Sequence, residues 1–186
     1  MQPDSEKQHA SPVHKSRLNK KYLVLVIVLS LGLIAFFRLI QFLTIVYVVQ
    51  PVRIEGIAMM PNLNDGDKVF ILKRVSELKR GDIVVLLYSQ DQSKSYIKRI
   101  IGLPGETIEI NEGKVRINGK PLDEPYLDPK LDIDYTMPQT LTIPADQYFV
   151  IGDNRGHSSD SRAWGPVPRN LIYGKYWFRY WSAKHD

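Results

Sequence analysis

The chain has 186 residues, of which 44% are hydrophobic; 25 Lys and Arg stand against 20 Asp and Glu, and there is no cysteine. This length suits one compact domain with an appendage and excludes a large multidomain assembly. Without cysteine there is no disulfide framework, no thiolate nucleophile and no cysteine-ligated metal site, so covalent chemistry must use oxygen or nitrogen. Three of the four histidines lie in the polar tails and only His157 is expected in the folded part, which disfavours a Ser-His-Asp triad.

Residues 1–21 form a polar, basic tail that holds most of the excess positive charge. Nothing in this tail is periodic or apolar enough to bury, so it is predicted to be disordered. A basic tail can bind nucleic acid, but this one runs directly into an apolar block, and the rest of the chain has no basic stripe and no recognition motif. The tail is therefore interpreted as a topology signal, and no nucleic-acid partner is expected.

Residues 22–41 are predicted to form one transmembrane helix. The run from Tyr22 to Phe37 carries no formal charge, and about 20 apolar residues are needed to cross about 30 Å of hydrocarbon. A cleavable signal peptide would have a shorter apolar region of about 7–15 residues and small residues at its end, whereas Phe36, Phe37 and Arg38 stand there. A retained membrane anchor in contact with lipid is favoured.

Cations lie mainly before this span, at Lys15, Arg17, Lys20 and Lys21. The positive-inside rule then keeps the N-terminus in the cytoplasm and exports everything after about residue 45. The expected protein is a single-pass protein of the cell membrane whose residues 42–186 form an extracytoplasmic domain.

The exported part is predicted to be mainly β and antiparallel, because short apolar or alternating runs are separated by turn residues about every ten positions. Glu112-Gly113 and Asn118-Gly119 predict two consecutive hairpins. The proline-rich stretch 121–144 is expected to be an extended, loop-rich excursion. The predicted strands are Ile45–Val49, Lys68–Leu72, Asp82–Leu87, Thr107–Ile110, Lys114–Ile117, Tyr148–Ile151 and Leu171–Tyr180.

Three stretches carry residues suited to chemistry: 55–63 (EGIAMMPNL), 95–105 (SYIKRIIGLPG) and 152–165 (GDNRGHSSDSRAWG). Together with the upstream apolar span, they resemble type I signal peptidases, membrane-bound Ser-Lys proteases that remove signal peptides from exported proteins. The resemblance covers about residues 15–181 in the family's order and spacing. It implies a β-rich catalytic domain of the signal-peptidase and LexA-like type, no cofactor, and signal peptides of exported preproteins as substrates.

The first stretch resembles the family's nucleophile box, Ser-Met-x-Pro-Thr-Leu, but Ala58 occupies the nucleophile position and Asn62 stands where threonine is usual. A methyl group cannot attack a carbonyl, so this chain is expected to be catalytically inactive. Two explanations stay open: an engineered serine-to-alanine change, which is favoured because the rest of the machinery is present, and a natural paralogue that binds signal peptides without cutting them. By itself, Ala58 is simply a small residue in a turn.

In the second stretch, Lys98 matches the family's general base. Burial among apolar neighbours lowers a lysine pKa from about 10.4 to about 7–8, where the neutral amine accepts a proton. Without the resemblance, spacing alone would favour a solvent-facing Lys-Arg pair at a strand edge.

The third stretch resembles the family's Gly-Asp-Asn-Arg box. The resemblance implies that Ser158 hydrogen-bonds and orients the Lys98 amine, while Asp160 and Arg162 form a supporting ion pair. Taken alone, Asp153 and Asp160 are possible calcium ligands, but calcium prefers six to eight oxygens and the regular EF-hand spacing is missing. No metal is expected, and His157 is interpreted as a surface side chain.

The resemblance also implies an oxyanion donor and a substrate groove. The backbone N–H of residue 58 is one expected donor; some relatives add a serine hydroxyl at the position of Gly56, which has no side chain, so the second donor stays open. Relatives bind the peptide before the scissile bond as an added strand and accept small residues in the Ala-x-Ala pattern. The matching substrate-binding positions, which by themselves are ordinary β-domain core residues, are Ile54, Gly56, Met59, Leu63, Val69, Tyr96 and Ile97.

A third hypothesis, a LexA-like self-cleaving Ser-Lys protein, is disfavoured because a membrane anchor stands where a DNA-binding module would be expected.

Overall fold

The computed structural model describes residues 19–73, 75–130 and 140–183 of the chain. The chain divides into two units, Met1–Leu43 and Thr44–Asp186. Most of the predicted disordered tail, residues 1–18, lies outside the described residues, and so does part of the proline-rich stretch, residues 131–139.

Helix α1 (Lys20–Val48) is apolar along its length, and it is the one described helix that is long and apolar enough to cross a membrane. Its 29 residues correspond to roughly 43 Å at the usual rise of an α-helix. The helix extends beyond the predicted limits of 22–41, and the predicted strand at Ile45–Val49 is wrong because all but its last residue continue α1. Strand propensity of β-branched residues depends on context, and an apolar helix satisfies its own backbone hydrogen bonds.

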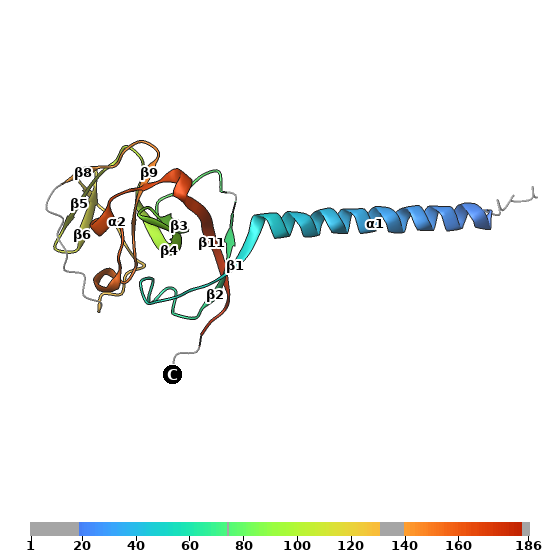
Figure 1. Ribbon diagram of the computed structural model, residues 1–186, viewed down its shortest axis with the longest axis horizontal. Coiled ribbons are helices and arrows are strands. Elements are labelled where there is room, and N and C mark those ends of the chain that lie inside the picture. The colour runs from blue at the N-terminus through green and yellow to red at the C-terminus, as the bar shows by residue number, and fades with distance from the viewer. Residues whose placement is uncertain (1–18, 74, 131–139, 184–186) are drawn as a thin grey trace, which may run out of the picture. The chain divides into compact units, whose positions relative to one another are not determined.

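A seven-stranded antiparallel sheet forms the larger part of the β domain (Figure 1), and its strand order is β1-β2-β11-β3-β4-β9-β10. The order brings the first and last strands of the domain together around β2. Its strands are β1 (Val49–Arg53), β2 (Lys68–Leu72), β3 (Ile83–Tyr88), β4 (Asp91–Gly102), β9 (Gln147–Ile151), β10 (Val167–Pro168) and β11 (Ile172–Trp181).

A four-stranded antiparallel sheet, in the order β7-β6-β5-β8, makes the second layer. Its strands are β5 (Thr107–Asn111), β6 (Lys114–Ile117), β7 (Lys120–Pro121) and β8 (Leu141–Thr142). The two predicted hairpins are confirmed: Glu112, Gly113, Asn118 and Gly119 all have φ between 47° and 76°, as two-residue turns of type I′ require.

The other predicted strands are confirmed to within one or two residues at each end. Strand β4 was not predicted from the sequence, although it is the longest described strand of the domain and carries Lys98. Its first half, Asp91–Ser95, is polar and largely exposed, so it lacks the apolar alternation from which a strand is recognised.

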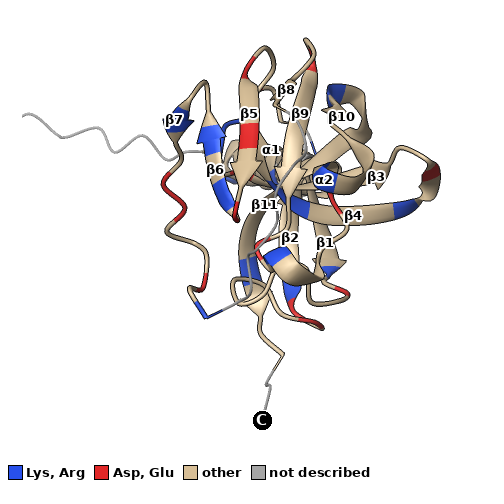
Figure 2. Ribbon diagram, turned by 90° about the vertical axis from the view of Figure 1, so that its left-hand side faces the viewer, with Lys and Arg blue, Asp and Glu red and all other residues tan. Residues whose placement is uncertain are grey.

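Charged residues are interspersed over the β domain. Figure 2 shows Lys and Arg among Asp and Glu on the strands and loops. Several of these charges are paired inside the domain, including Asp67 with Arg179 and Asp153 with Arg99.

The buried apolar side chains form three clusters. One of them lies beneath the 55–63 stretch and includes Ile54, Met59, Leu63 and Val69. At about 25 cal/mol per Å² of apolar surface removed from water, such a cluster is a main source of the domain's stability. The apolar side chains of the 55–63 stretch, Met59 and Leu63, are packed in this cluster and fix the stretch to the domain.

The Asp67 side chain connects β11 and the residues just after it to the loop before β2. The carboxylate is fully buried and accepts hydrogen bonds from the Arg179 guanidinium (2.8 Å), the Ala183 N–H (2.9 Å) and the Asn64 N–H (2.9 Å). Burial alone would raise the Asp67 pKa, but these donors together outweigh it and hold the pKa below its usual value.

We expect Asp67→Asn to lower the free energy of unfolding by about 1–3 kcal/mol, because buried N–H donors lose a charged acceptor. Since the folded pKa lies below the unfolded value, this difference should be present above about pH 4 and shrink as the pH falls further. Denaturant unfolding between pH 3 and pH 7 measures both effects. Asp91→Asn, which alters an exposed ion pair, is the control and should change stability little; an equal loss in both variants would contradict the assignment.

Candidate active site

A cleft of about 660 Å³ opens in the β domain, and Ala58 and Lys98 both line it. The strands that meet here are β1, β3, β4 and β11, together with the loops after β1 and after β9. The other lining residues are Val52, Arg53, Ile54, Glu55, Gly56, Ile57, Met59, Val85, Ser93, Lys94, Ser95, Tyr96, Ile97, His157, Ser159 and Tyr173. The cleft therefore joins residues from all three stretches that the sequence singled out.

The loop that carries Ala58 is fixed by its backbone. Asn154 holds it twice, with its N–H on the Ala58 carbonyl (3.0 Å) and its side-chain amide on the Ile57 carbonyl (3.2 Å). On the other side, the Gly56 N–H donates to the Asp65 carboxylate (2.7 Å). Gly56 has a φ of 85°, a conformation that glycine adopts without strain.

Gly152 lets two parts of the site approach closely. A Cβ at this position would lie 2.2 Å from the Ser158 Oγ and 2.6 Å from the Ala58 carbonyl oxygen. No side chain fits into that space. The glycine at position 152 therefore allows both Ser158 and the backbone of Ala58 to pack against it.

Lys98 lies opposite Val84 in the β3–β4 ladder and is 3% exposed. Burial lowers the pKa of its amine to about 8; the Arg162 charge lowers it further, while Asp160 and Asp153 partly oppose the shift. The amine lies 5.3 Å from the centroid of the Tyr96 ring. A substantial fraction of the amine is therefore neutral near pH 8, as a general base requires.

Ser158 differs from expectation in one respect. Its Oγ is buried and makes no hydrogen bond with any described residue, so the expected bond to the Lys98 amine is not formed in this structure. A buried hydroxyl without a partner is unfavourable. Its role in orienting Lys98 stays a prediction.

The expected ion pair between Asp160 and Arg162 is present and bidentate, with both N–O distances 2.8 Å. Asp160 is fully buried; it also accepts the Gly152 N–H (3.1 Å) and caps the short helix α2 (Ser161–Trp164). The carboxylate therefore connects α2 to the glycine on which Ser158 and Ala58 meet.

Asp153 is likewise engaged by an arginine. The Arg99 Nε and Nη2 donate to its two oxygens at 2.8 and 2.6 Å. Among the described residues, no group of three or more His, Cys, Asp or Glu could hold a metal ion. Both carboxylates that a calcium site would need are bound to guanidinium groups instead.

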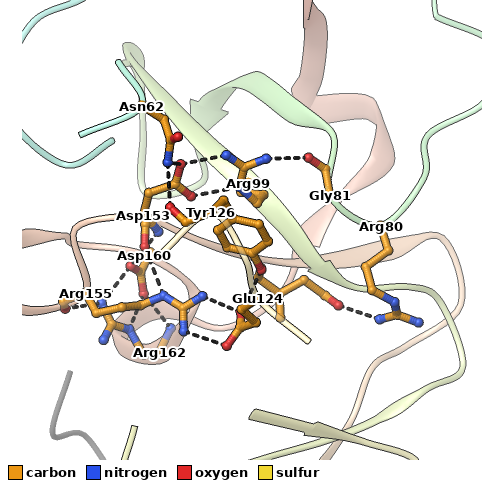
Figure 3. A network of polar contacts seen from close by, with 12 residues as sticks. Asn62, Arg80, Gly81, Arg99, Glu124, Tyr126, Asp153, Arg155, Asp160 and Arg162 are labelled. Carbon is orange, nitrogen blue, oxygen red and sulfur yellow. Dashed lines mark hydrogen bonds and ion pairs between the residues drawn. The ribbon is translucent and has the colours of Figure 1, made fainter. Parts of the chain in front are cut away.

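A buried polar network that was not predicted from the sequence (Figure 3) connects Asn62, Arg99, Glu124, Tyr126 and Arg155 with Asp153 and Asp160. No local pattern could have revealed it, because its partners are separated by 31 residues for Arg155 and Glu124 and by 91 for Asn62 and Asp153. The analysis also gave no role to Ile57 and Ser159, which line the cleft.

Five of the seven predicted substrate-binding residues line the cleft: Ile54, Gly56, Met59, Tyr96 and Ile97. Leu63 and Val69 do not, and lie instead in the core cluster below it. The Gly56 N–H is engaged by Asp65, so it is not free to serve as the second oxyanion donor. His157 is exposed, as expected, and lies at the cleft.

One edge of β4 is open beside the cleft. Residues Ser95 to Ile97 pair with β3 on one side, whereas β9 pairs on the other side only from Arg99 onward. In the described part of the chain no other strand covers this edge. Unpaired backbone groups at such an edge accept an extended peptide as an additional strand.

An antiparallel β domain with an open strand edge and a buried, deprotonable lysine fits the class of peptidases that use an amine as general base. The signal peptidase family, peptidase S26, matches residues 22–181. This match covers most of the chain, and the chain belongs to that family of proteases.

Two relatives of this chain are signal peptidases, in agreement with the family match. Signal peptidase IB of Staphylococcus aureus (strain Mu50) is 35% identical over 161 residues, which cover 75% of this chain and 83% of the relative. Probable signal peptidase I-2 of Synechocystis sp. is 34% identical over 189 aligned positions, gaps included. The match covers 97% of this chain and 80% of the relative. A crystal structure of a signal peptidase I from Enterococcus faecalis V583 is 34% identical, covers 55% of this chain and 98% of its own, and superposes with a TM-score of 0.47.

The lowered Lys98 pKa predicts a stability effect of known sign. The unfolded lysine titrates near 10.4, so between about pH 8 and pH 10.4 the unfolded state binds more protons and stability rises with pH. We expect Lys98→Met to stabilise the chain at pH 7 by on the order of 2 kcal/mol and to lose this advantage near pH 10.5. Denaturant unfolding in detergent at both pH values measures it. Lys94→Met, at an exposed lysine, should give no gain; a gain there, or none at Lys98, would contradict the assignment.

Proposed function

We propose that this chain is a signal peptidase I whose nucleophile is replaced by Ala58. With serine at position 58, it would cleave N-terminal signal peptides of exported preproteins after Ala-x-Ala-type sites. The observation that carries the proposal is the buried Lys98 amine in the same cleft as Ala58, whose loop is hydrogen-bonded to Asn154 and packs closely against Gly152. Family membership supports the same reaction.

In the serine form, the hydroxyl of the serine at position 58 attacks the scissile carbonyl while the neutral Lys98 amine takes its proton. The same proton passes to the departing amine, which leaves the signal peptide as an acyl-enzyme. Water then attacks the ester with Lys98 as base and restores the serine. The backbone N–H of residue 58 is the first oxyanion donor in this proposal. The chain as it stands has no hydroxyl at that position and is inactive by this route.

The substrate is proposed to bind as a strand along the open edge of β4. Ile54, Met59 and Ile97 are apolar and line the cleft, so they suit small apolar side chains. Alternate side chains of an added strand face the same way, which matches a preference at the first and third residues before the cleaved bond.

We further propose that α1 anchors the chain in the cell membrane, with the N-terminus in the cytoplasm and the β domain outside. Its exposed apolar surface and its length support this, as do the cations that precede it. The partners are then membrane lipid and emerging signal peptides, with no metal, cofactor or nucleic acid.

A non-catalytic paralogue that binds signal peptides and releases them uncut is the second candidate. Ala58 itself is the observation that favours it, because a chain that only binds peptides needs the cleft and the open strand edge but no nucleophile. The two candidates differ in what a restored hydroxyl does, since only a disabled peptidase regains cleavage.

Ala58→Ser should restore cleavage of a preprotein after Ala-x-Ala by at least about 10⁴-fold over the unchanged chain, because the nucleophile is the missing group. The rate should rise with pH through a midpoint near 8, the Lys98 pKa. Cleavage by purified protein in detergent, followed by mass spectrometry, measures this. The double variant Ala58→Ser with Lys98→Met is the control and should be inactive. Binding of the signal peptide by both forms without cleavage by either would favour the paralogue.

External protease added to bacterial spheroplasts should digest the β domain and leave the N-terminal tail protected. Replacement of Lys15, Arg17, Lys20 and Lys21 by Gln should give mixed orientations, because the positive-inside rule loses its charges. Immunoblotting with tags at both ends reads the result. A protected β domain in the unchanged chain would overturn the proposed topology.

A further inference from the structure

Residues 122–130 follow β7 as an irregular segment with turns and without helix or strand, and two of their side chains reach the network behind the active site. These are Glu124, whose side chain is 8% exposed, and the partly buried Tyr126. Neither residue lies in the three stretches 55–63, 95–105 and 152–165, which carry the motifs of the family. Their contacts nevertheless reach each of those stretches (Figure 3).

Glu124 contacts the third stretch through Arg155. The Arg155 Nη2 lies 2.5 Å from the Glu124 Oε1, and Nη1 donates to Oε2 at 3.3 Å. The Arg155 Nε donates to the Gly152 carbonyl at 3.2 Å, and this side chain is only 4% exposed. Glu124 therefore holds, through one guanidinium, the glycine against which Ser158 and the Ala58 backbone pack.

Tyr126 contacts the other two stretches. The Arg99 guanidinium, next to Lys98 in sequence, lies 4.1 Å from the centroid of the Tyr126 ring. The Tyr126 carbonyl accepts a hydrogen bond from the Asn62 amide (2.8 Å), and the same amide donates to Asp153 (2.9 Å). A guanidinium over an aromatic face in a desolvated site is a favourable contact.

The two side chains also act on each other. The Tyr126 hydroxyl donates to the Glu124 Oε1 at 2.7 Å. Burial, with the Glu124 charge, raises the Tyr126 pKa far above its ordinary value, so the hydroxyl stays a donor throughout the working pH range. The Glu124 carboxylate thus has both a cationic partner and a neutral donor, as a buried charge requires.

We propose that Glu124 and Tyr126 are positioning residues of the peptidase site, which hold the nucleophile loop, the Lys98 strand and the Ser158 loop in register with one another. This inference rests on the proposed function of the same site. Neither residue touches the reacting atoms; they act through Arg155, Arg99 and Asn62. Small displacements of reacting groups cost large factors in rate. Loss of the contacts that Glu124 and Tyr126 make with Arg155, Arg99 and Asn62, which together we call the clamp, should therefore lower kcat more than it weakens substrate binding.

The test uses the full chain with Ala58→Ser. Glu124→Gln removes the charge while keeping the shape, and Tyr126→Phe removes only the hydroxyl. We expect Glu124→Gln to lower kcat about 10-fold or more with KM changed less than about 3-fold, and Tyr126→Phe to lower kcat by a smaller factor. Glu124→Asp, which restores the charge, should recover part of the loss. The pH midpoint and the melting temperature are measured alongside.

Asp67→Asn is the control, because it removes a buried charge whose partners Asn64, Arg179, Ser182 and Ala183 lie outside the three stretches. Of these partners, Arg179 also donates to the Asn62 carbonyl (3.3 Å), and not to the Asn62 amide that contacts Tyr126 and Asp153. It should lower the melting temperature and leave kcat within about 2-fold. If Glu124→Gln and Tyr126→Phe lower only the melting temperature, as this control does, the two residues are merely structural and the proposal is overturned. Should Glu124→Gln fail to fold, Tyr126→Leu decides, because it removes both the ring over the Arg99 guanidinium and the hydroxyl that contacts Glu124.

A measurement on the unchanged Ala58 chain separates this proposal from the proposed function. If Ala58→Ser proves inactive, the peptidase assignment fails and NMR titration of labelled lysine side chains decides the clamp. Glu124→Gln should then raise the Lys98 pKa from about 8 towards its ordinary value, because separated segments admit water, whereas Asp67→Asn should leave it unchanged. An unchanged Lys98 pKa in the Glu124→Gln and Tyr126→Phe chains would overturn the clamp.

Discussion

The desolvation of the Lys98 amine is the constraint on which the rest of the site depends. An ammonium group loses much of its hydration when it is buried, and the protein compensates by letting the amine lose its proton near pH 8. This requires Lys98 to lie on an interior strand, opposite Val84, with Tyr96 beside it. The same burial that costs stability near neutral pH makes the amine a base, so the site exchanges stability for reactivity.

Buried arginine–carboxylate pairs surround this amine and do two things at once. Asp160 with Arg162 and Asp153 with Arg99 have nearly no exposed surface on their carboxylates. Because each carboxylate is neutralised by its own arginine, the negative charges raise the Lys98 pKa only in part. The pairs also fix the backbone, since Asp160 holds the Gly152 N–H. The ion pairs therefore fix the geometry of the site, whereas burial of the amine is the main cause of its lowered pKa.

Ala58 places a methyl group and no hydroxyl in the cleft. The cleft has a volume of about 660 Å³ and the strand edge at Ser95–Ile97 is unpaired on one side. Neither feature depends on a hydroxyl at position 58. The geometry thus fits both a disabled peptidase and a peptide-binding paralogue, because both have the same alanine at position 58.

The sequence by itself determined the apolar helix, the hairpins with Glu112-Gly113 and Asn118-Gly119, most strands and the three stretches that form the cleft, because these depend on local periodicity, turn chemistry and short motifs. Only the tertiary structure decided where the helix ends, that Leu63 and Val69 lie in the core, and that Glu124 and Tyr126 join the site. Such facts arise from contacts between residues distant in sequence, and side-chain burial and charge pairing across those distances leave no local pattern from which they could be predicted.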